Sequence, residues 1–448
     1  MHSKDPSKGA SAERVRIGRR QFLKRATTVG AVAAGFPYIV PSSALGFADT
    51  PAPSERITLG LIGLGRMMGN HHGTFLNNNA TQILAVCDVE ARRVAAYKQK
   101  TEEHYAKASP DGSYKGCDTY GDFRELCARP DIDAVVIATP NHWHALTAIT
   151  AAKEGKDIYS EKPLTETIEE GKAMVAAVRR YGRVFQTGSQ QRSERGFRVA
   201  CELVRNGRIG KVHTVHVNVG GPPVDCYLPA EPTPEGLNWD FWLGPAPWRP
   251  YHSDIAPNME FTGWPNWRSY RDYAGGMMTD WGAHHFDIAQ WGLGMDESGP
   301  VEIVPPNGSD VERLTYKYAN GVTMYHGGGS GGKAGVEFIG TEGRVMVNRG
   351  YLETDPGHLK DEPIGPNEIH LYETVNHHHN WLECIRTRKR PICDVEIGYR
   401  SVTVCLLGNL AYQLKRPLKW DPAQENFVDD PQASRLLKRS MRAPWRLV

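Results

Sequence analysis

Short apolar runs alternate with segments that look helical through the first half of this chain. The run over residues 132–138 is largely apolar, as expected for a strand that is buried on both faces. We therefore predict strands over 57–62, 83–88, 132–138, 157–159 and 184–186. One helix is predicted to end at residue 75, and three others are predicted over 91–100, 145–154 and 168–181. Strands that alternate with helices predict a doubly wound parallel sheet, here an α/β Rossmann domain over residues 56–190.

The pattern changes near residue 190. Residues 212–219 alternate apolar with polar positions, as in a strand with one exposed face. Further strands are predicted over 311–318, 322–325, 336–339 and 344–347, and helices over 380–388 and 401–414. Residues 191–448 are therefore expected to form an α+β substrate domain with a large, mostly antiparallel open sheet.

A proline-rich segment interrupts this second half. Residues 222–265 contain ten prolines, and five tryptophans lie in the segment or just after it, at positions 239, 242, 248, 264 and 267. A long irregular segment in a compact domain is usually functional. Its aromatic rings could stack on a sugar ring, or they could simply pack the loop.

The N-terminus carries an unusual charge pattern. Residues 1–25 hold eight Lys or Arg and two acidic residues, while residues 26–48 hold no charge. Adjacent Arg19 and Arg20 precede an apolar run that is too short, and too rich in Gly and Pro, to span a membrane comfortably. We predict a twin-arginine signal over residues 1–48, a linker over 49–55, and a periplasmic or otherwise exported protein without a membrane anchor after cleavage. The remaining body is mildly acidic, which argues against a nucleic-acid partner.

A glycine turn follows the first strand. Gly63 and Gly65 lie between this strand and the next helix, and Asp88 ends the second strand. Such glycines let the backbone approach a pyrophosphate, and the acid binds ribose hydroxyls and favours NAD. Met68 stands where a third glycine is expected, with Gly69 one residue late. Two arginines shortly after Asp88 leave NADP open.

Polar segments follow two other strands of the predicted sheet. Residues 139–141 come after one strand and residues 161–163 after the next. Ligands in such sheets bind beyond the carboxyl ends of the strands. The Lys162 ammonium could therefore stabilise the alkoxide that forms as hydride leaves a substrate carbon. An isolated Lys-Pro pair is more often a surface lysine before a helix-starting proline.

Asp280 and His284 are four residues apart. On one helix both side chains would lie on the same face, one turn apart. A carboxylate next to an imidazole fixes the tautomer and tunes a base that works near neutral pH. The same spacing also occurs in packed cores. The pair therefore indicates a catalytic role only together with the nucleotide-binding pattern upstream.

Together these residues resemble the Gfo/Idh/MocA oxidoreductases, which are NAD(P)-dependent dehydrogenases acting mainly on sugars and cyclitols. The likeness covers residues 56–420. It rests on the Rossmann entry, on Thr139-Pro140 with His144, on Gly155-Lys156-Asp157 leading into Glu161-Lys162-Pro163, and on Gly275-Gly276 leading into Asp280-x-Gly282-x-His284. The resemblance implies that Lys162, Asp280 and His284 are catalytic: His284 takes the hydroxyl proton, Lys162 stabilises the oxyanion, and Asp280 orients His284 or shares its proton.

The remaining candidate site residues fall into two groups. The predicted cofactor contacts are Gly63, Gly65, Arg66, Met67, Asp88, Thr139, Pro140, Asn141, His144, Glu161 and Lys162. The candidate substrate contacts are Gln191, Arg192, Trp267, Arg268 and Asp287, although a salt bridge at the domain junction explains Arg192 equally well. No metal is predicted, because neither the eight cysteines nor His377-His378-His379 have the spacing of a metal site.

Three functions fit these features. The first is NAD-dependent oxidation of a secondary hydroxyl of a sugar, glycoside or cyclitol, with a tightly held cofactor because an exported protein has no free nicotinamide pool. The second is glycoside hydrolysis through transient oxidation and elimination at the same site. The third is a non-catalytic sugar- or nucleotide-binding protein. The resemblance also implies a homodimer or homotetramer that pairs through the open face of the second sheet.

Overall fold

The computed structural model describes residues 53–109, 112–330, 333 and 335–447. The predicted twin-arginine signal over residues 1–48 lies outside this part of the chain. Residues from Glu55 onward cluster as one unit. Among the described residues, no helix combines the length and the apolar character needed to cross a membrane.

The first sheet has the strand order β3-β2-β1-β4-β5-β6, and all of its strands are parallel. In that order the strands span Asp118–Tyr120, Thr81–Cys87, Ile57–Ile62, Ala134–Ile137, Asp157–Ser160 and Phe185–Thr187. The order confirms the predicted Rossmann sheet, and it reverses between β1 and β4, where such sheets bind their ligands. β3 was not predicted, because its three residues are polar or half-exposed and form no apolar run.

Helices cover both faces of this sheet. The main ones are α3 (Arg66–Leu76), α4 (Ala91–Ala106), α6 (Asn141–Lys153) and α7 (Ile168–Arg180), with a short α5 at Phe123–Cys127. The start of α7 is fixed by a capping box, in which the Thr167 hydroxyl accepts from the Glu170 N–H and the Glu170 carboxylate accepts from the Thr167 N–H.

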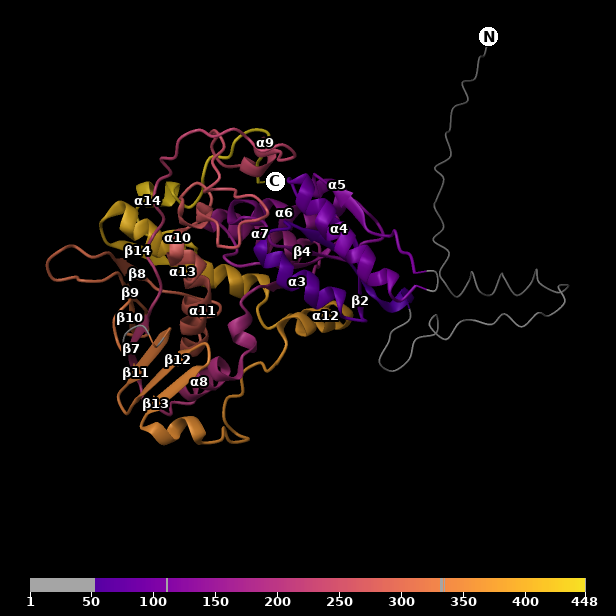
Figure 1. The fold of residues 1–448 in the computed structure, drawn as a ribbon. Coiled ribbons are helices and arrows are strands. Elements are labelled where there is room, and N and C mark those ends of the chain that lie inside the picture. The colour runs from indigo at the N-terminus through magenta and orange to yellow at the C-terminus, as the bar shows by residue number, and fades with distance from the viewer. Residues whose placement is uncertain (1–52, 110–111, 331–332, 334, 448) are drawn as a thin grey trace, which may run out of the picture. The chain divides into compact units, whose positions relative to one another are not determined.

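One helix from late in the sequence also packs on the Rossmann sheet. α12 (His377–Thr387) places Trp381 against Phe75 of α3 and Tyr159 of β5, with ring centroids 5.6 and 5.7 Å apart. Figure 1 shows α12 next to α3. The chain therefore returns to the nucleotide-binding half after it has built most of the second sheet.

The second sheet has the order β13-β12-β11-β7-β10-β9-β8-β14-β15. These strands span Tyr351–Asp355, Arg344–Asn348, Val336–Gly340, Val212–Val217, Thr323–His326, Thr315–Lys317, Glu302–Val304, Leu418–Asp421 and Asn426–Phe427. Every pair is antiparallel except β7 with β10, which confirms the predicted, mostly antiparallel sheet. The helices α8 (Arg195–Arg205), α11 (Gly282–Leu293) and α13 (Val395–Leu414) contact this sheet, and α11 packs against both of the other two.

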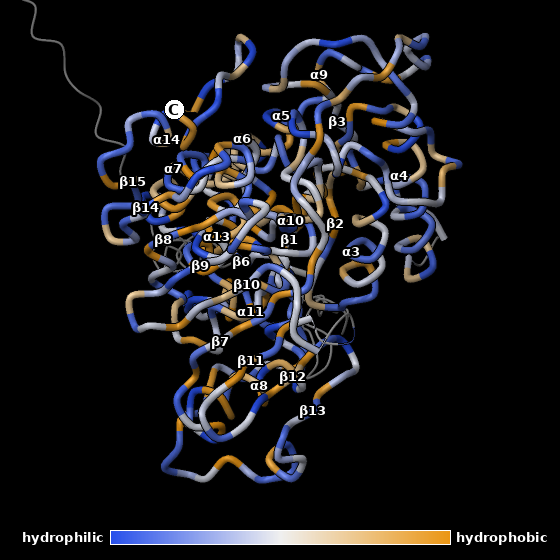
Figure 2. The backbone as a smooth tube through the Cα atoms, turned by 90° about the vertical axis from the view of Figure 1, so that its left-hand side faces the viewer, coloured by the Kyte–Doolittle hydropathy of each residue, from blue (hydrophilic) through white to orange (hydrophobic). Residues whose placement is uncertain are grey.

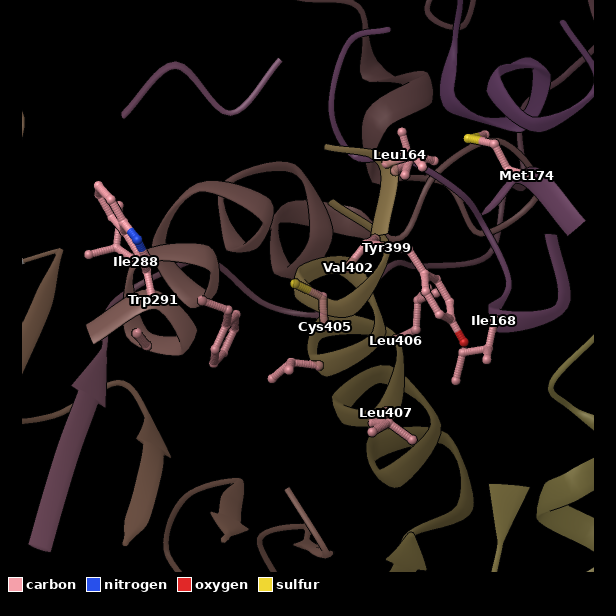
Figure 3. Close-up of a cluster of buried hydrophobic side chains, with 14 of the residues drawn as sticks. Leu164, Ile168, Met174, Ile288, Trp291, Tyr399, Val402, Cys405, Leu406 and Leu407 are labelled. Carbon is pink, nitrogen blue, oxygen red and sulfur yellow. The ribbon is translucent and has the colours of Figure 1, made fainter. Parts of the chain in front are cut away.

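Helix α13 joins the two halves. It is apolar around most of its circumference, which is typical of a helix buried on all sides. Tyr399 packs over Gly171 of α7, where any Cβ would lie 2.2 Å from the Tyr399 ring. Figure 3 shows the Tyr399 ring beside Ile168 on this side of the helix. Helix α13 therefore contacts both α7 of the Rossmann half and β8 of the second sheet. In Figure 2 much of β2 is coloured as hydrophobic, in keeping with its buried position in the first sheet.

Candidate active site

A cavity of about 1240 Å³ lies over the carboxyl ends of the Rossmann strands. The glycine turn, the ends of β2, β4 and β5, the proline-rich segment and the start of α11 all contribute to its wall. Of the predicted residues, those that line it are Gly63, Gly65, Arg66, Met67, Asp88, Thr139, Pro140, Asn141, Glu161, Lys162, Trp267, Arg268, Asp280 and His284. The fold thus brings most of the predicted cofactor and catalytic residues to one place.

The glycine turn has the geometry that a pyrophosphate site requires. Gly63 has a φ of +83°, and a Cβ at this position would lie 2.6 Å from the Thr139 backbone nitrogen. Gly65 precedes α3, whose first N–H groups receive no side-chain cap. The Met68 side chain is fully buried in the Rossmann core. Met68, which stands in place of the third glycine, therefore packs into the core on the buried side of α3.

Substitution of Gly63 by alanine should be damaging. We expect Gly63→Ala to destabilise the fold by about 1–3 kcal/mol and to weaken NAD binding, because the methyl group meets a backbone that cannot move aside. Gly73→Ala is the matched control, since a Cβ on this α3 glycine meets nothing within 4 Å. Urea unfolding and NAD titration of both variants measure the difference. Equal stability of the two variants would show that the turn tolerates a side chain.

Asp88 is held at the end of β2. Its carboxylate accepts hydrogen bonds from the backbone N–H groups of Leu64 (2.6 Å) and Glu90 (2.9 Å), and burial raises its pKa. Of the two arginines that left NADP open, Arg92 pairs with Glu90 and Glu260, and Arg93 donates to the Pro257 carbonyl. Both arginines are therefore engaged within the chain, which agrees with a site for NAD.

Lys162 and Asp280 form the polar centre of the cavity. The Lys162 ammonium lies 3.1 Å from Asp280 Oδ1 and 3.1 Å from the Asp280 carbonyl oxygen. The Arg268 guanidinium donates to the other carboxylate oxygen of Asp280. Burial alone would raise the pKa of Asp280, but the two cations outweigh burial and hold that pKa below its usual value. Asp280 is therefore a carboxylate that positions the Lys162 ammonium.

The Asp280 and His284 spacing does not produce the predicted contact. Helix α10 (Gly276–Asp280) ends at Asp280, the chain turns at Trp281, and α11 begins at Gly282. The Asp280 carboxylate is taken up by Lys162 and Arg268, and among the described residues Nδ1 of His284 has no hydrogen-bond partner. The predicted hydrogen bond between Asp280 and His284 is therefore absent among the described residues, because two cations bind this carboxylate instead.

His284 is a neutral imidazole at the cavity wall. Burial, followed by the charges of Lys162 and Arg349, holds its pKa well below the usual value of 6.5. Its side chain packs edge-on against Trp281, with ring centroids 5.9 Å apart. A neutral imidazole beside an ammonium can accept a proton from a hydroxyl group bound between them.

Four predicted site residues do not line the cavity. His144 Nδ1 lies 2.8 Å from the Pro163 carbonyl oxygen and its Nε2 lies 2.9 Å from the Thr139 carbonyl oxygen, so the ring lies between the segments that follow β4 and β5, and its N–H donates to one of them. Gln191, oriented by its hydrogen bonds, donates to the His284 carbonyl (3.0 Å) and accepts from Arg349 (3.2 Å). Arg192 and Asp287 form a fully buried ion pair with each other. His144 and Gln191 therefore contact residues of the cavity wall without lining the cavity themselves.

Sequence reasoning missed Arg349. This residue occupies the tight turn between β12 and β13 and lines the cavity near His284. Its guanidinium carbon lies 4.9 Å from the centroid of the Trp281 ring. The only sequence signal was the Asn348-Arg349-Gly350 turn, which does not reveal where the hairpin points.

The three consecutive histidines have different environments. His377 is buried and bonds to Ser193 and to the Thr187 carbonyl, both at 2.8 Å. His378 is half-buried and bonds to His71, whereas His379 is exposed. Within the described ranges, no group of three or more His, Cys, Asp or Glu side chains is arranged to hold a metal ion.

Comparison with known proteins identifies the family. Residues 57–189 match the NAD-binding Rossmann fold of the oxidoreductase family GFO_IDH_MocA, and residues 224–447 match its C-terminal alpha/beta domain. The chain belongs to the Gfo/Idh/MocA family. Inositol 2-dehydrogenase 2 of Saccharopolyspora erythraea is 30% identical over 73% of this chain and 77% of its own length. The predicted family, its Rossmann domain and its NAD cofactor are thereby confirmed.

Other curated relatives align over shorter stretches. An alpha-N-acetylgalactosaminidase of Shewanella oneidensis is 34% identical over 34% of this chain and 35% of its own length. The chain spans less than half the length of the first curated relatives it matches. The WlbA dehydrogenase of Bordetella pertussis, solved with NADH and UDP-GlcNAcA, shares the fold with a TM-score of 0.57 at 18% identity, over 82% of this chain and 99% of WlbA.

Proposed function

We propose that this protein oxidises a secondary hydroxyl group of a sugar, glycoside or cyclitol by hydride transfer to NAD. The observation that carries the proposal is the meeting of Lys162, Asp280 and His284 in the cavity that Gly63 and Asp88 also line. A proton acceptor, an oxyanion stabiliser and a dinucleotide site within one cavity are what alcohol oxidation requires.

Each residue has a defined role in this reaction. The turn after β1 and the start of α3 would hold the pyrophosphate of NAD, and Asp88 would accept from its ribose hydroxyls. When bound, NAD accepts the hydride from the substrate carbon. His284 accepts the hydroxyl proton, and Lys162 donates a hydrogen bond to the same oxygen as negative charge develops on it. Asp280 keeps the Lys162 ammonium in position.

The outer wall of the cavity suits a sugar ring. Trp264, Trp267 and Trp281 all line it, and the guanidinium carbons of Arg66 and Arg268 lie 4.9 and 5.0 Å from the centroid of the Trp264 ring. Flat aromatic faces pack on the C–H groups of a sugar, and arginines bind its hydroxyls. The proline-rich segment supplies Trp264, and Trp267 follows directly after it.

The pH profile should reflect the environment of His284. Only the neutral imidazole accepts a proton, and its pKa lies well below 6.5 because it is buried near Lys162 and Arg349. We therefore expect kcat/KM to stay flat as pH falls through 6.5, and to decrease only at a distinctly lower pH. A profile of initial rates checks this. An acid limb centred near 6.5 would mean that His284 is not the base, or is not buried in the active form.

Glycoside hydrolysis is the second candidate function. Oxidation of a ring hydroxyl acidifies the neighbouring C–H, so that a glycosidic group can be eliminated, water can add and the hydride can return. Lys162 and His284 would serve both reactions. The alignment with a protein named alpha-N-acetylgalactosaminidase supports glycoside hydrolysis as a second candidate. Incubation with aryl glycosides separates the two: release of the aryl alcohol without added oxidant favours the hydrolase, and accumulation of reduced nicotinamide favours the dehydrogenase.

We also propose that the protein is exported with its cofactor already bound. The support is the Arg19-Arg20 pattern before an uncharged, Ala-rich run, because the twin-arginine route carries folded proteins. Denaturing the protein purified from its native compartment should then release one nicotinamide dinucleotide per chain. Cytoplasmic localisation, or apoprotein that needs added NAD for each turnover, would contradict the proposal.

The assembly proposed is a homodimer or homotetramer that pairs through the open face of the second sheet. Light scattering on the purified protein tests it, and a monomer at micromolar concentration would contradict it.

The non-catalytic alternative is tested separately, because a binding protein would show no turnover that depends on Lys162 or His284.

A further inference from the structure

One guanidinium group at the substrate end of the cavity has no carboxylate partner. Arg349, in the turn between β12 and β13, lines the cavity together with His284 and Trp281. Among the described residues Arg349 forms no salt bridge, whereas Arg268 on the same cavity wall binds Asp280. An arginine side chain is always charged, so the positive charge of Arg349 is available to a ligand.

Neighbouring groups hold the Arg349 guanidinium in place. Its carbon lies 4.9 Å from the centroid of the Trp281 ring, within the range of a cation–π contact. The Nε–H group donates to the side-chain oxygen of the buried Gln191 (3.2 Å), whose amide nitrogen donates to the His284 carbonyl (3.0 Å). The Arg349 backbone N–H donates to Oδ1 of Asn348 (2.8 Å). The guanidinium is therefore positioned relative to His284 before a ligand binds.

The two terminal nitrogens of Arg349 point to the kind of group that binds there. Neither has a hydrogen-bond partner among the described residues, and the side chain is exposed to the cavity. Terminal guanidinium nitrogens donate two parallel hydrogen bonds, which match two oxygens of a carboxylate or of a sulfate ester. A sugar hydroxyl offers one oxygen and no charge, so it would use this group only in part.

The cations next to the reacting centre share a single carboxylate. Lys162 and Arg268 both bind Asp280, which leaves this group of three with one positive charge in excess. Arg349 adds a further positive charge, and its field reaches the reacting centre because Lys162 and Arg349 both contribute to the lowered pKa of His284. This end of the cavity therefore attracts negative charge.

Two other carboxylates line the same cavity. Glu161 pairs with His71 at 2.9 Å. Glu194, at the start of α8, forms no salt bridge among the described residues; burial raises its pKa, and the charge of Arg349 opposes that rise. A Glu194 carboxylate would therefore compete with an anionic ligand for Arg349, and its removal should strengthen the binding of such a ligand.

We propose that the substrate is a sugar or glycoside with an anionic substituent, a carboxylate or a sulfate ester, that binds Arg349. The inference rests on the proposed oxidation and names the substrate class for it. The anionic group accepts from both terminal nitrogens of Arg349, while the reacting hydroxyl of the same sugar lies between Lys162 and His284. Arg349 selects and orients the substrate and takes no part in the transfer of proton or hydride.

Matched pairs of substrates test this preference. Holoenzyme is given methyl glucoside, methyl glucuronide and a sulfated methyl glucoside, then the same three derivatives of galactose, and reduction of nicotinamide is recorded. We expect kcat/KM to be about 10- to 100-fold higher for at least one anionic form than for its neutral counterpart, because two charge-assisted hydrogen bonds are added. High salt should reduce this preference. Whether the uronide or the sulfated glycoside reacts faster identifies the anionic group.

Three variants connect the preference with Arg349. Arg349→Met removes the charge but keeps a long side chain against Trp281, so kcat/KM should fall by about 10- to 100-fold for the anionic sugar and by less than about threefold for the neutral one. Glu194→Gln should increase the preference for the anionic sugar. Arg313→Met is the matched control, because Arg313 pairs with Glu312 on the surface and lies outside the cavity. It should keep the wild-type preference.

Equal kcat/KM for neutral and anionic sugars, or an equal loss for both in Arg349→Met, would overturn the inference. Calorimetric titration of the wild-type holoenzyme with the same sugars needs neither a variant nor turnover. It should show tighter binding of an anionic form, weakened by salt, and equal affinities would again overturn the inference. A wild type that binds the anionic sugar but reduces no nicotinamide with any sugar would instead contradict the proposed oxidation, so the two failures are distinguishable.

Discussion

Replacing Lys162 with alanine is expected to lower kcat by about 1000-fold while the protein remains folded and keeps its cofactor. The ammonium is the one cation held beside His284 by both the carboxylate and the carbonyl of Asp280. It acts on the oxyanion that exists only as the hydride leaves, and removal of such a donor typically costs two to three orders of magnitude, about 3–4 kcal/mol. Steady-state rates with a sugar that the wild-type enzyme oxidises measure the loss of kcat.

The local structure should survive this change. In Lys162→Ala the Asp280 carboxylate keeps the Arg268 guanidinium as its partner, so no buried charge is left alone. Lys172→Ala is the control, because Lys172 pairs with Glu169 on the surface of α7 and lies outside the cavity. If Lys162→Ala kept more than a tenth of the wild-type kcat, Lys162 would not be the oxyanion stabiliser, and the catalytic assignment would have to be revised.

Removal of the Asp287 carboxylate is expected to destabilise the fold by about 3–5 kcal/mol. The Arg192 guanidinium contacts Asp287 through two hydrogen bonds of 2.8 Å, and the Ser401 hydroxyl donates to the same carboxylate. Arg192 and Asp287 are both essentially inaccessible to water. Asp287→Ala therefore leaves the buried Arg192 guanidinium with the partly exposed Asp296 as its remaining carboxylate partner among the described residues, and urea unfolding should show the loss.

A neighbouring carboxylate provides the matched control for Asp287. Asp296 also pairs with Arg192, at 2.7 Å, but its side chain is 28% exposed. In Asp296→Ala water can replace the lost carboxylate and Asp287 still compensates the charge, so the loss should be much smaller. A double variant that replaces Arg192 and Asp287 with apolar residues should lose less than Asp287→Ala alone. Equal losses for Asp287→Ala and Asp296→Ala would contradict this explanation.

The sequence was most informative where local pattern and chemistry coincide. The apolar runs of β1, β2 and β4 are buried on both faces, so burial itself made these strands visible. Lys162 was recognisable because residues at the carboxyl ends of parallel strands meet at one edge of the sheet. By contrast, β3 is short and mostly exposed, and nothing in its composition distinguishes it from a loop.

Contacts over long sequence distances could not be predicted in the same way. Helical spacing suggested that Asp280 contacts His284, but the chain turns at Trp281, and Lys162 and Arg268 bind the carboxylate instead. The position of Arg349 depends on how the second sheet packs on α11, which no local pattern encodes. The link between His71 and His378 joins residues 307 positions apart and depends on the return of α12 to the Rossmann sheet.

A spectrum recorded before and after a sugar is added to the protein as purified would detect the hydride transfer itself. In the proposed reaction, nicotinamide held over the glycine turn takes a hydride from a sugar carbon beside Lys162 and His284. We expect the near-ultraviolet band of reduced nicotinamide to appear in the wild type with at least one member of a panel of sugars, glycosides and cyclitols. Lys162→Ala should hold the same amount of cofactor and show no band on this timescale. Protein that neither contains nicotinamide nor binds it when it is added, or a band of equal size and rate in Lys162→Ala, would contradict the account.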